Sequence, residues 1–202
     1  MRMVTAFSVG LALVPASLQA QPLQSSSRNA RVQMQRFAAC VADHSSEKAA
    51  RTLAMDFRSV TYRSALRNLS SANAGCFPYR GKMRSGSLLF AGGMAERLMQ
   101  RDSRPLNVRL ARAATQSAPP ARSPTDAIAI CVVRSAPDET ARLFATEVAS
   151  DAETEAAKAL GLAVKLCSQG QPPLEANVEA LRAMLATAAY RNVGQLAFAE
   201  RG

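Results

Sequence analysis

Four cysteines are the residues of this chain whose chemistry is easiest to define. Cys40 and Cys76 are 36 positions apart, Cys131 and Cys167 are also 36 apart, and the second pair follows the first by 91 positions. Zinc sites usually bring their cysteines in close pairs such as Cys-x2-Cys, which this sequence lacks. A Cys-x-x-Cys redox motif and a Cys-x-x-Cys-His haem site are also absent. The spacing therefore favours disulfides over a metal site.

The two cysteine pairs belong to a repeat with an offset of 91 positions. An ungapped overlay at this offset also superposes many identical residues, among them Val41 on Val132, Ala50-Arg51 on Ala141-Arg142, Ser59 on Ser150 and Leu69 on Leu160. Four cysteines allow three pairings, and the duplication selects Cys40–Cys76 and Cys131–Cys167, because each unit must close its own loop. Closing a loop of about 37 residues stabilises a fold by roughly 4 kcal/mol in the chain-entropy model.

His44 is the sole histidine, so a Ser-His-Asp or Cys-His mechanism would depend on it alone. Asp43 and Glu47 lie near it in the sequence and could complete such a group. However, His44 falls at the predicted end of a helix, where an imidazolium suits the helix dipole. Its counterpart in the second repeat is Ser135. We interpret His44 as a structural residue.

Carboxylates could also supply acid-base chemistry, as in glycoside hydrolysis. The candidate groups are Glu96 with Asp102, and the run Asp151, Glu153 and Glu155. The run falls in the first turn of a predicted helix, where negative charge suits the dipole. We therefore expect no catalytic residue, no cofactor-binding residue and no metal ligand, and a protein that is not an enzyme.

Helices must position these residues, because alanine is abundant, aromatic residues make up 5% of the chain and tryptophan is absent. We predict an all-α fold of two tandem disulfide-closed repeats, each with about four helices. The first helix shows i, i+3, i+4, i+7 spacing in Phe37, Cys40, Val41 and His44, and again in Ile128, Cys131, Val132 and Ser135. The second helix shows it in Ala50, Leu53, Ala54 and Phe57, and again in Ala141, Phe144, Ala145 and Val148.

The third and fourth helices follow the same logic. Ser59 and Ser150 precede the third helix, and Ser150 with Glu153 has the Ser-x-x-Glu form of a capping box. Gly161 can interrupt the second copy before its cysteine. The fourth helix is predicted from about Met83 to Gln100, with inward residues Met83, Phe90, Met94 and Leu98 matched by Leu174, Leu181, Leu185 and Ala189. Gly92-Gly93 lacks the Gly-Lys-Ser/Thr of a phosphate loop and favours a close helix contact.

The expected organisation begins with a secretory signal peptide over 1–20, since a basic start is followed by an apolar run and small residues. Repeat 1 then covers 21–101 and repeat 2 covers 125–202. A linker rich in Pro, Ala, Arg and Ser fills 102–124 between them. No other segment is apolar enough to span a bilayer, so we expect an exported bacterial protein, periplasmic or secreted, where disulfides persist.

Charge is unevenly distributed along the chain, whose net charge is +10. Residues 21–125 hold 17 Arg and Lys against 5 Asp and Glu, whereas residues 126–202 hold 7 against 10. This asymmetry permits weak attraction to anionic surfaces. The basic residues are not interleaved with the stacking aromatics of nucleic-acid sites, so we expect no specific nucleic acid.

The Cys-Cys pair followed by the Ala-rich helix Gly92-Gly93-Met94-Ala95-Glu96-Arg97-Leu98-Met99 resembles a group of small exported helical proteins of α-proteobacteria, of the sphingomonad kind. The second repeat departs from this pattern, with Thr187 in place of Glu96. The resemblance implies an exported helical protein and no activity. We expect a binding or envelope-associated protein, with a polyanion-binding module based on the basic first repeat and an envelope hydrolase as alternatives.

Overall fold

The computed structural model describes residues 27–77, 86–172 and 174–199, and within them every regular element is helical. The predicted all-α class is therefore confirmed. The predicted signal peptide and Met83 lie outside the described residues. The elements are α1 (Arg28–His44), α2 (Ser46–Ala54), α3 (Val60–Ala72), the 3₁₀-helix η1 (Ala74–Cys76), α4 (Ser87–Gln100), α5 (Leu106–Ala114), α6 (Pro124–Ser135), α7 (Pro137–Ala145), α8 (Asp151–Ala159), α9 (Gly161–Cys167) and α10 (Val178–Ala199).

Helix boundaries recur at the offset seen in the sequence. Both ends of α7 lie 91 positions after those of α2, and α10 begins 91 positions after α4. The N-caps recur as well, because the Ser59 side chain accepts from Tyr62 N and the Ser150 side chain accepts from Glu153 N. Gly161 begins a separate helix, α9, as its position suggested. These helix starts thus recur at the offset, whereas the ends of α8 and α10 do not match those of α3 and α4.

The second helix of each repeat buries part of the predicted face, since Leu53 and Phe144 are buried as expected, but the rest of the buried face differs. The buried residues are Ala49, Thr52 and Leu53 in α2 and, at the same offset, Thr140, Leu143 and Phe144 in α7. The predicted Ala54 and Ala145 are exposed, and Phe57 and Val148 are half-buried. The helices end at residues 54 and 145, so an i+7 extrapolation to residues 57 and 148 runs past the helical geometry.

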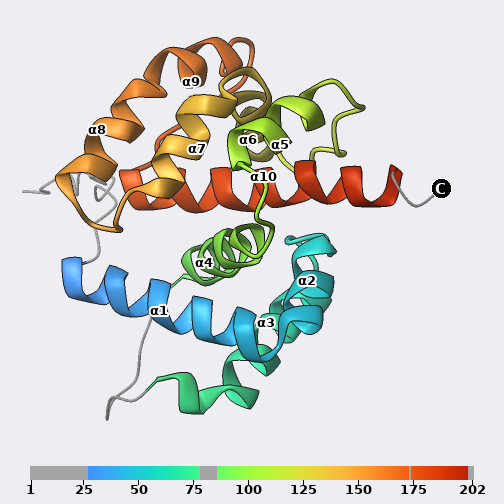
Figure 1. The fold of residues 1–202 in the computed structure, drawn as a ribbon, viewed down its shortest axis with the longest axis vertical. Coiled ribbons are helices and arrows are strands. Elements are labelled where there is room, and N and C mark those ends of the chain that lie inside the picture. Colours follow the sequence, from blue (N-terminus) through green and yellow to red (C-terminus); the bar gives the residue numbers. More distant parts are fainter. Residues whose placement is uncertain (1–26, 78–85, 173, 200–202) are drawn as a thin grey trace, which may run out of the picture.

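Helix α4 lies between α1 and α10, and α10 runs along the side of α6, α7 and α8 (Figure 1). Gly92 and Gly93 make this arrangement possible. A Cβ at Gly92 would lie 2.7 Å from Ala183 Cα of α10, and one at Gly93 would lie 2.7 Å from Ala38 Cβ of α1. The predicted close helix contact is confirmed on both sides of α4. Buried apolar side chains of the two halves join one continuous core.

The segment 102–124 is more than the linker that its composition suggested. It contains α5, whose Leu110 and Ala113 are buried against α6, α7 and α10. Arg109 is buried too and donates from Nη2 to Met99 O at 2.8 Å. Leu106, Leu110 and Ala113 have helical spacing, but the surrounding Pro, Arg and Ser residues gave the segment the composition of a linker.

Candidate ligand-binding site

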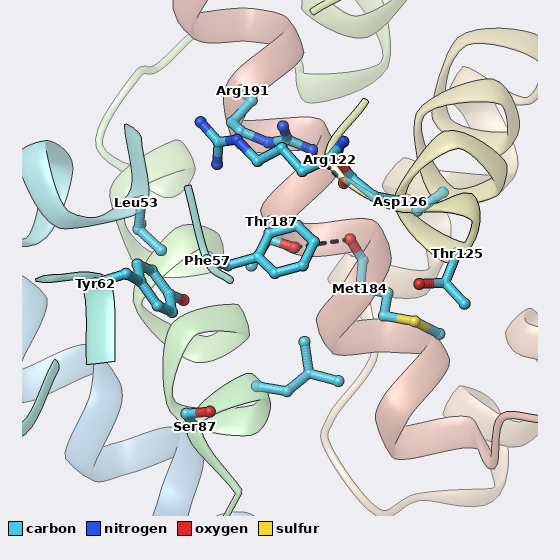
Figure 2. Close-up of a pocket in the computed structure, with 12 residues that line it drawn as sticks. Leu53, Phe57, Tyr62, Ser87, Arg122, Thr125, Asp126, Met184, Thr187 and Arg191 are labelled. Carbon is cyan, nitrogen blue, oxygen red and sulfur yellow. Dashed lines mark hydrogen bonds and ion pairs between the residues drawn. The ribbon is translucent and has the colours of Figure 1, made fainter. Parts of the chain in front are cut away.

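A pocket of about 260 Å³ lies where residues of the first half meet α6 and α10 (Figure 2). Its apolar walls are Leu53, Phe57, Leu88, Ala129 and Met184. Its polar lining consists of Tyr62, Ser87, Arg122, Thr125, Asp126, Thr187 and Arg191. Figure 2 shows Phe57 in the middle of this group, with Arg122 and Arg191 above it and Ser87 below. An apolar cavity with a few polar groups at one end is the usual form of a small-molecule site.

Asp126 organises the polar end of the pocket. It lies in the first turn of α6, where Ser123 Oγ accepts a hydrogen bond from Asp126 N at 3.1 Å. The Asp126 carboxylate accepts from Arg122 N at 2.8 Å and forms an ion pair with the Arg191 guanidinium of α10. Asp126 and Arg191 are both largely buried, so this pair ties α6 to α10 in the wall of the pocket.

Arg122 brings a second guanidinium to the same place. Its Nη2 donates to Ala54 O at 2.6 Å, and no carboxylate of the described residues lies within ion-pair distance of it. Burial lowers the pKa of Arg191, and Asp126 opposes this effect; an arginine still keeps its charge under all ordinary conditions. The charged lining residues of the pocket are therefore Arg122, Arg191 and Asp126, and the Asp56 carboxylate outside the lining also acts electrostatically on both arginines.

Tyr62 presents a hydroxyl without a partner. The residue is only 6% exposed, and its hydroxyl has no hydrogen-bond partner among the described residues. Burial raises the pKa of Tyr62 to about 12, although Arg122 and Arg191 act in the opposite direction. The phenol is therefore neutral at physiological pH and can donate a hydrogen bond.

A second polar cluster, the buried ion cluster, consists of Arg31, Glu96, Glu153, Glu179 and Arg182. Arg182 pairs with Glu96 at 2.7 Å and with Glu153 at 3.2 Å, and Arg31 pairs with Glu153 at 2.7 Å. Arg31 Nε also lies 3.1 Å from Glu179 Oε2, an ion pair without the alignment of a hydrogen bond. The adjacent cavity of about 30 Å³ has room for water and none for a ligand. This cluster therefore joins α1, α4, α8 and α10 and is no binding site.

The structure does not bring the sequence-proposed carboxylate pairs together. Glu96 belongs to the buried ion cluster, whereas Asp102 is held by Arg104 at 2.8 Å near the start of α5. Of the acidic run in α8, Glu153 is buried, while Asp151 is exposed and Glu155 pairs with exposed Lys158 at 2.8 Å. Each carboxylate has a structural partner or faces solvent, and no acid-base pair results.

Both predicted disulfides, Cys40–Cys76 and Cys131–Cys167, are present. His44 is the last residue of α1, and its Nδ1 lies 3.4 Å from Cys40 Sγ and 3.8 Å from Cys76 Sγ. These three residues form a group with metal-ligand atoms. The two sulfurs are bonded to each other, however, so they offer no thiolate to a metal ion.

No family model, curated sequence or solved structure matches the chain. Among the described residues, no helix combines the length and apolar character needed to cross a membrane. The site can therefore be interpreted only from its own geometry.

The pocket residues were missed at the sequence level for a definable reason. In the sequence, Asp126 has only the pattern of a residue near a helix start, and Tyr62 only that of an aromatic residue near basic ones. Arg122 and Arg191 stand in different segments, with no spacing that relates them. The start of α6 at Ser123 and Pro124 was the one local signal close to the site.

Proposed function

We propose that this protein is an exported, non-catalytic binding protein whose pocket takes a small amphipathic anion with an apolar body and one carboxylate. The observation that carries this proposal is the Arg122 guanidinium, which lines a mainly apolar pocket and has no carboxylate of the described residues within ion-pair distance. A ligand carboxylate would supply that partner, and guanidinium and carboxylate groups form strong two-point hydrogen bonds.

The remaining lining suits the rest of such a ligand. Phe57, Leu53 and Met184 offer apolar surface to a short alkyl or aryl chain, whose burial gains about 25 cal/mol per Å². The Tyr62 hydroxyl can donate a second hydrogen bond to the carboxylate. A volume of about 260 Å³ favours a ligand the size of octanoate over a membrane lipid.

The export part of the proposal is supported by the disulfides and by the N-terminal sequence pattern, and not by the pocket. Two disulfides are compatible with an oxidising compartment, since such bonds are rare in the cytoplasm. The signal-peptide pattern over 1–20 and the resemblance to exported α-proteobacterial proteins support the same placement. Intact-mass measurement of the protein recovered from its native host should give an N-terminus near Gln21; a mass that includes the leader would contradict export by cleavage.

Titration calorimetry with octanoate tests the binding proposal, with octan-1-ol and octylamine as neutral and cationic ligands of similar size. We expect octanoate to bind more tightly than either. Arg122→Met should weaken octanoate binding about tenfold or more, because a hydrogen bond to a charged group contributes about 1.5–3 kcal/mol. Tyr62→Phe should weaken it less, by roughly two- to tenfold.

The matched control is Arg63→Met, which removes the same charge from an exposed position on α3 outside the pocket. It should leave the affinity for octanoate unchanged. Equal loss in Arg63→Met and Arg122→Met would mean that net charge attracts the anion and that the pocket does not bind it. Octanol binding as tightly as octanoate would also overturn the proposed ligand class.

A further inference from the structure

The two disulfides occupy equivalent places in the repeats, but one neighbouring residue differs. His44 stands next to Cys40–Cys76, and Ser135 stands at the same offset next to Cys131–Cys167. His44 Nδ1 lies 3.4 Å from Cys40 Sγ, whereas the Ser135 hydroxyl lies 3.8 Å from Cys167 Sγ. The protein thus contains one disulfide with an imidazole beside it and one at the equivalent place without it. The second is the more accessible of the two, because Cys131 is exposed whereas Cys40 is half-buried.

The hydrogen on the imidazole can be assigned from its backbone contact. His44 Nδ1 lies 2.9 Å from Cys40 O, and a carbonyl oxygen can only accept a hydrogen bond. Nδ1 therefore carries a hydrogen. The same N–H group lies close enough to Cys40 Sγ to bond to that sulfur once it becomes a thiolate.

Small molecules can reach this group. The His44 side chain is exposed, and Cys40 and Cys76 are half-buried. Cys76 ends the short η1 helix, so its sulfur is held by one turn of chain at the edge of the core. A thiolate of low molecular weight can therefore approach Cys76 Sγ.

We infer that Cys40–Cys76 is a thiol-exchange site of this protein, in which His44 stabilises the leaving Cys40 thiolate. An external thiolate attacks Cys76 Sγ and forms a new S–S bond to it. The Cys40–Cys76 bond breaks, its electron pair stays on Cys40 Sγ, and His44 Nδ1–H donates a hydrogen bond to that thiolate. With a dithiol, the second thiol releases Cys76 as a thiolate, so the protein disulfide is reduced by two electrons and the dithiol is oxidised to a disulfide.

The acidity of the leaving Cys40 thiol explains why His44 should accelerate the opening of Cys40–Cys76. Thiol–disulfide exchange is faster when the departing thiol is more acidic, and a positive or hydrogen-bonding neighbour makes a thiol more acidic. With a Brønsted coefficient of roughly 0.5, a thiol more acidic by one pKa unit leaves about threefold faster. Ser135 offers Cys167 only a hydroxyl, which lies 3.8 Å from the sulfur, whereas the imidazole Nδ1 lies 3.4 Å from Cys40 Sγ. Both groups also donate to the backbone carbonyl four residues earlier, at 2.9 Å in each case. This site is independent of the ligand pocket.

Reduction of the folded protein by dithiothreitol, stopped at intervals by alkylation and read by peptide mass spectrometry, measures the opening rate of each disulfide. Because Cys131 is more exposed than Cys40, the opening rate of each disulfide is compared with that of the same disulfide in the variant, and not with that of the other disulfide. His44→Ser copies the second repeat into the first and should slow the opening of Cys40–Cys76 about threefold or more. Ser135→His makes the reverse change and should accelerate the opening of Cys131–Cys167.

His44 is exposed, so the oxidised His44→Ser protein should melt like the native protein, and this measurement separates reactivity from folding. An unchanged opening rate for Cys40–Cys76 in His44→Ser overturns the inference, whatever Ser135→His does. Slower opening in His44→Ser at an unchanged melting temperature supports it.

Discussion

Glu96 of α4 and Arg182 of α10 form a two-point ion pair, in which Nε donates to Oε1 at 2.8 Å and Nη2 donates to Oε2 at 2.7 Å. Both side chains are buried. The repeat counterparts of these residues are Thr187 and Ala91, so the pair has no symmetric copy. It joins the two halves at the place where α4 and α10 come closest, one helical turn from Gly92 and beside Ala183. The duplicated helices therefore depend on a polar contact that is unique to their interface.

Arg182→Met should destabilise the fold strongly, because it leaves Glu96 and Glu153 buried without their shared guanidinium. Breaking a buried pair by removing one partner typically costs about 3–5 kcal/mol in the free energy of unfolding. Urea denaturation measures this loss. Arg142→Met is the control, since Arg142 is exposed and pairs with Glu139 on its own helix at 3.3 Å; its loss should be about 0–1 kcal/mol. Equal stability of the two variants would show that the cluster contributes little.

Glu96 should make stability depend on pH in an unusual direction. Burial raises the pKa of Glu96, against the effect of Arg182, and the buried ion cluster holds three carboxylates but only two guanidiniums. A carboxyl with a raised folded pKa contributes stability that is full below its unfolded pKa, about 4.3, and that is lost as the pH rises through the folded value. The stability of the native protein relative to Glu96→Gln should therefore be greatest in mild acid and decline toward neutral pH.

Asp102 should change the free energy of unfolding with pH in the opposite direction to Glu96, so it serves as the control for this pH series. Hydrogen bonds from Arg104 hold the pKa of Asp102 well below its usual range. Its contribution is present above the unfolded value of about 3.9 and is lost as the pH falls. The native protein relative to Asp102→Asn should thus lose stability toward acid pH. Parallel curves for the two variants would contradict the assignment for Glu96.

Gly92→Ala should cost about 1–3 kcal/mol, because the new methyl group would overlap Ala183 Cα of α10 and force two helices apart. A melting curve followed by circular dichroism measures the effect. Gly161→Ala provides the comparison, since a Cβ at the start of α9 meets nothing within 4 Å and alanine favours helix. That variant should be as stable as the native protein or more so. An unchanged melting temperature in Gly92→Ala would mean that α4 and α10 can move apart with little loss of stability.

Leu143→Ala should lower the free energy of unfolding by about 2–5 kcal/mol, since Leu143 lies on the buried face of α7 and is 0% exposed. Leu162→Ala removes the same atoms from a side chain that is 69% exposed and should change stability by about 0.5 kcal/mol or less. Chemical denaturation of the pair isolates burial as the cause. A similar loss in both variants would place Leu143 outside the cooperative core.

Attraction to polyanions should be weak and sensitive to salt. Exposed arginines of the first half stand on separate helices, with Arg28 and Arg36 on α1 and Arg63 and Arg67 on α3. Such charges are screened over roughly 8 Å at physiological ionic strength, so elution from heparin should occur near that salt concentration. Arg80, Lys82 and Arg84 lie outside the described residues. Retention at twice physiological salt that disappears when these three are replaced together would establish a polyanion site.

The sequence by itself determined the features that depend on neighbours along the chain. Helical class, the serine caps before α3 and α8 and the break at Gly161 all follow from short-range periodicity and backbone preferences. The cysteine pairing followed from the repeat, because a duplicated unit carries its own loop closure. The Gly92-Gly93 pair predicted a close helix contact, but it did not indicate that α1 and α10 would be the helices packed there.

Only the tertiary structure decided which residues from distant segments meet. Arg122, Tyr62 and Arg191 line one pocket because α3, the segment before α6, and α10 converge there, and no local pattern encodes that convergence. The same holds for Glu96 and Arg182: the sequence suggested Asp102 as the neighbour of Glu96 and gave no spacing that relates Glu96 to Arg182. Packing also selected Leu143 over Ala145 for the core, since the face that a short helix buries depends on its neighbours as well as on its own spacing.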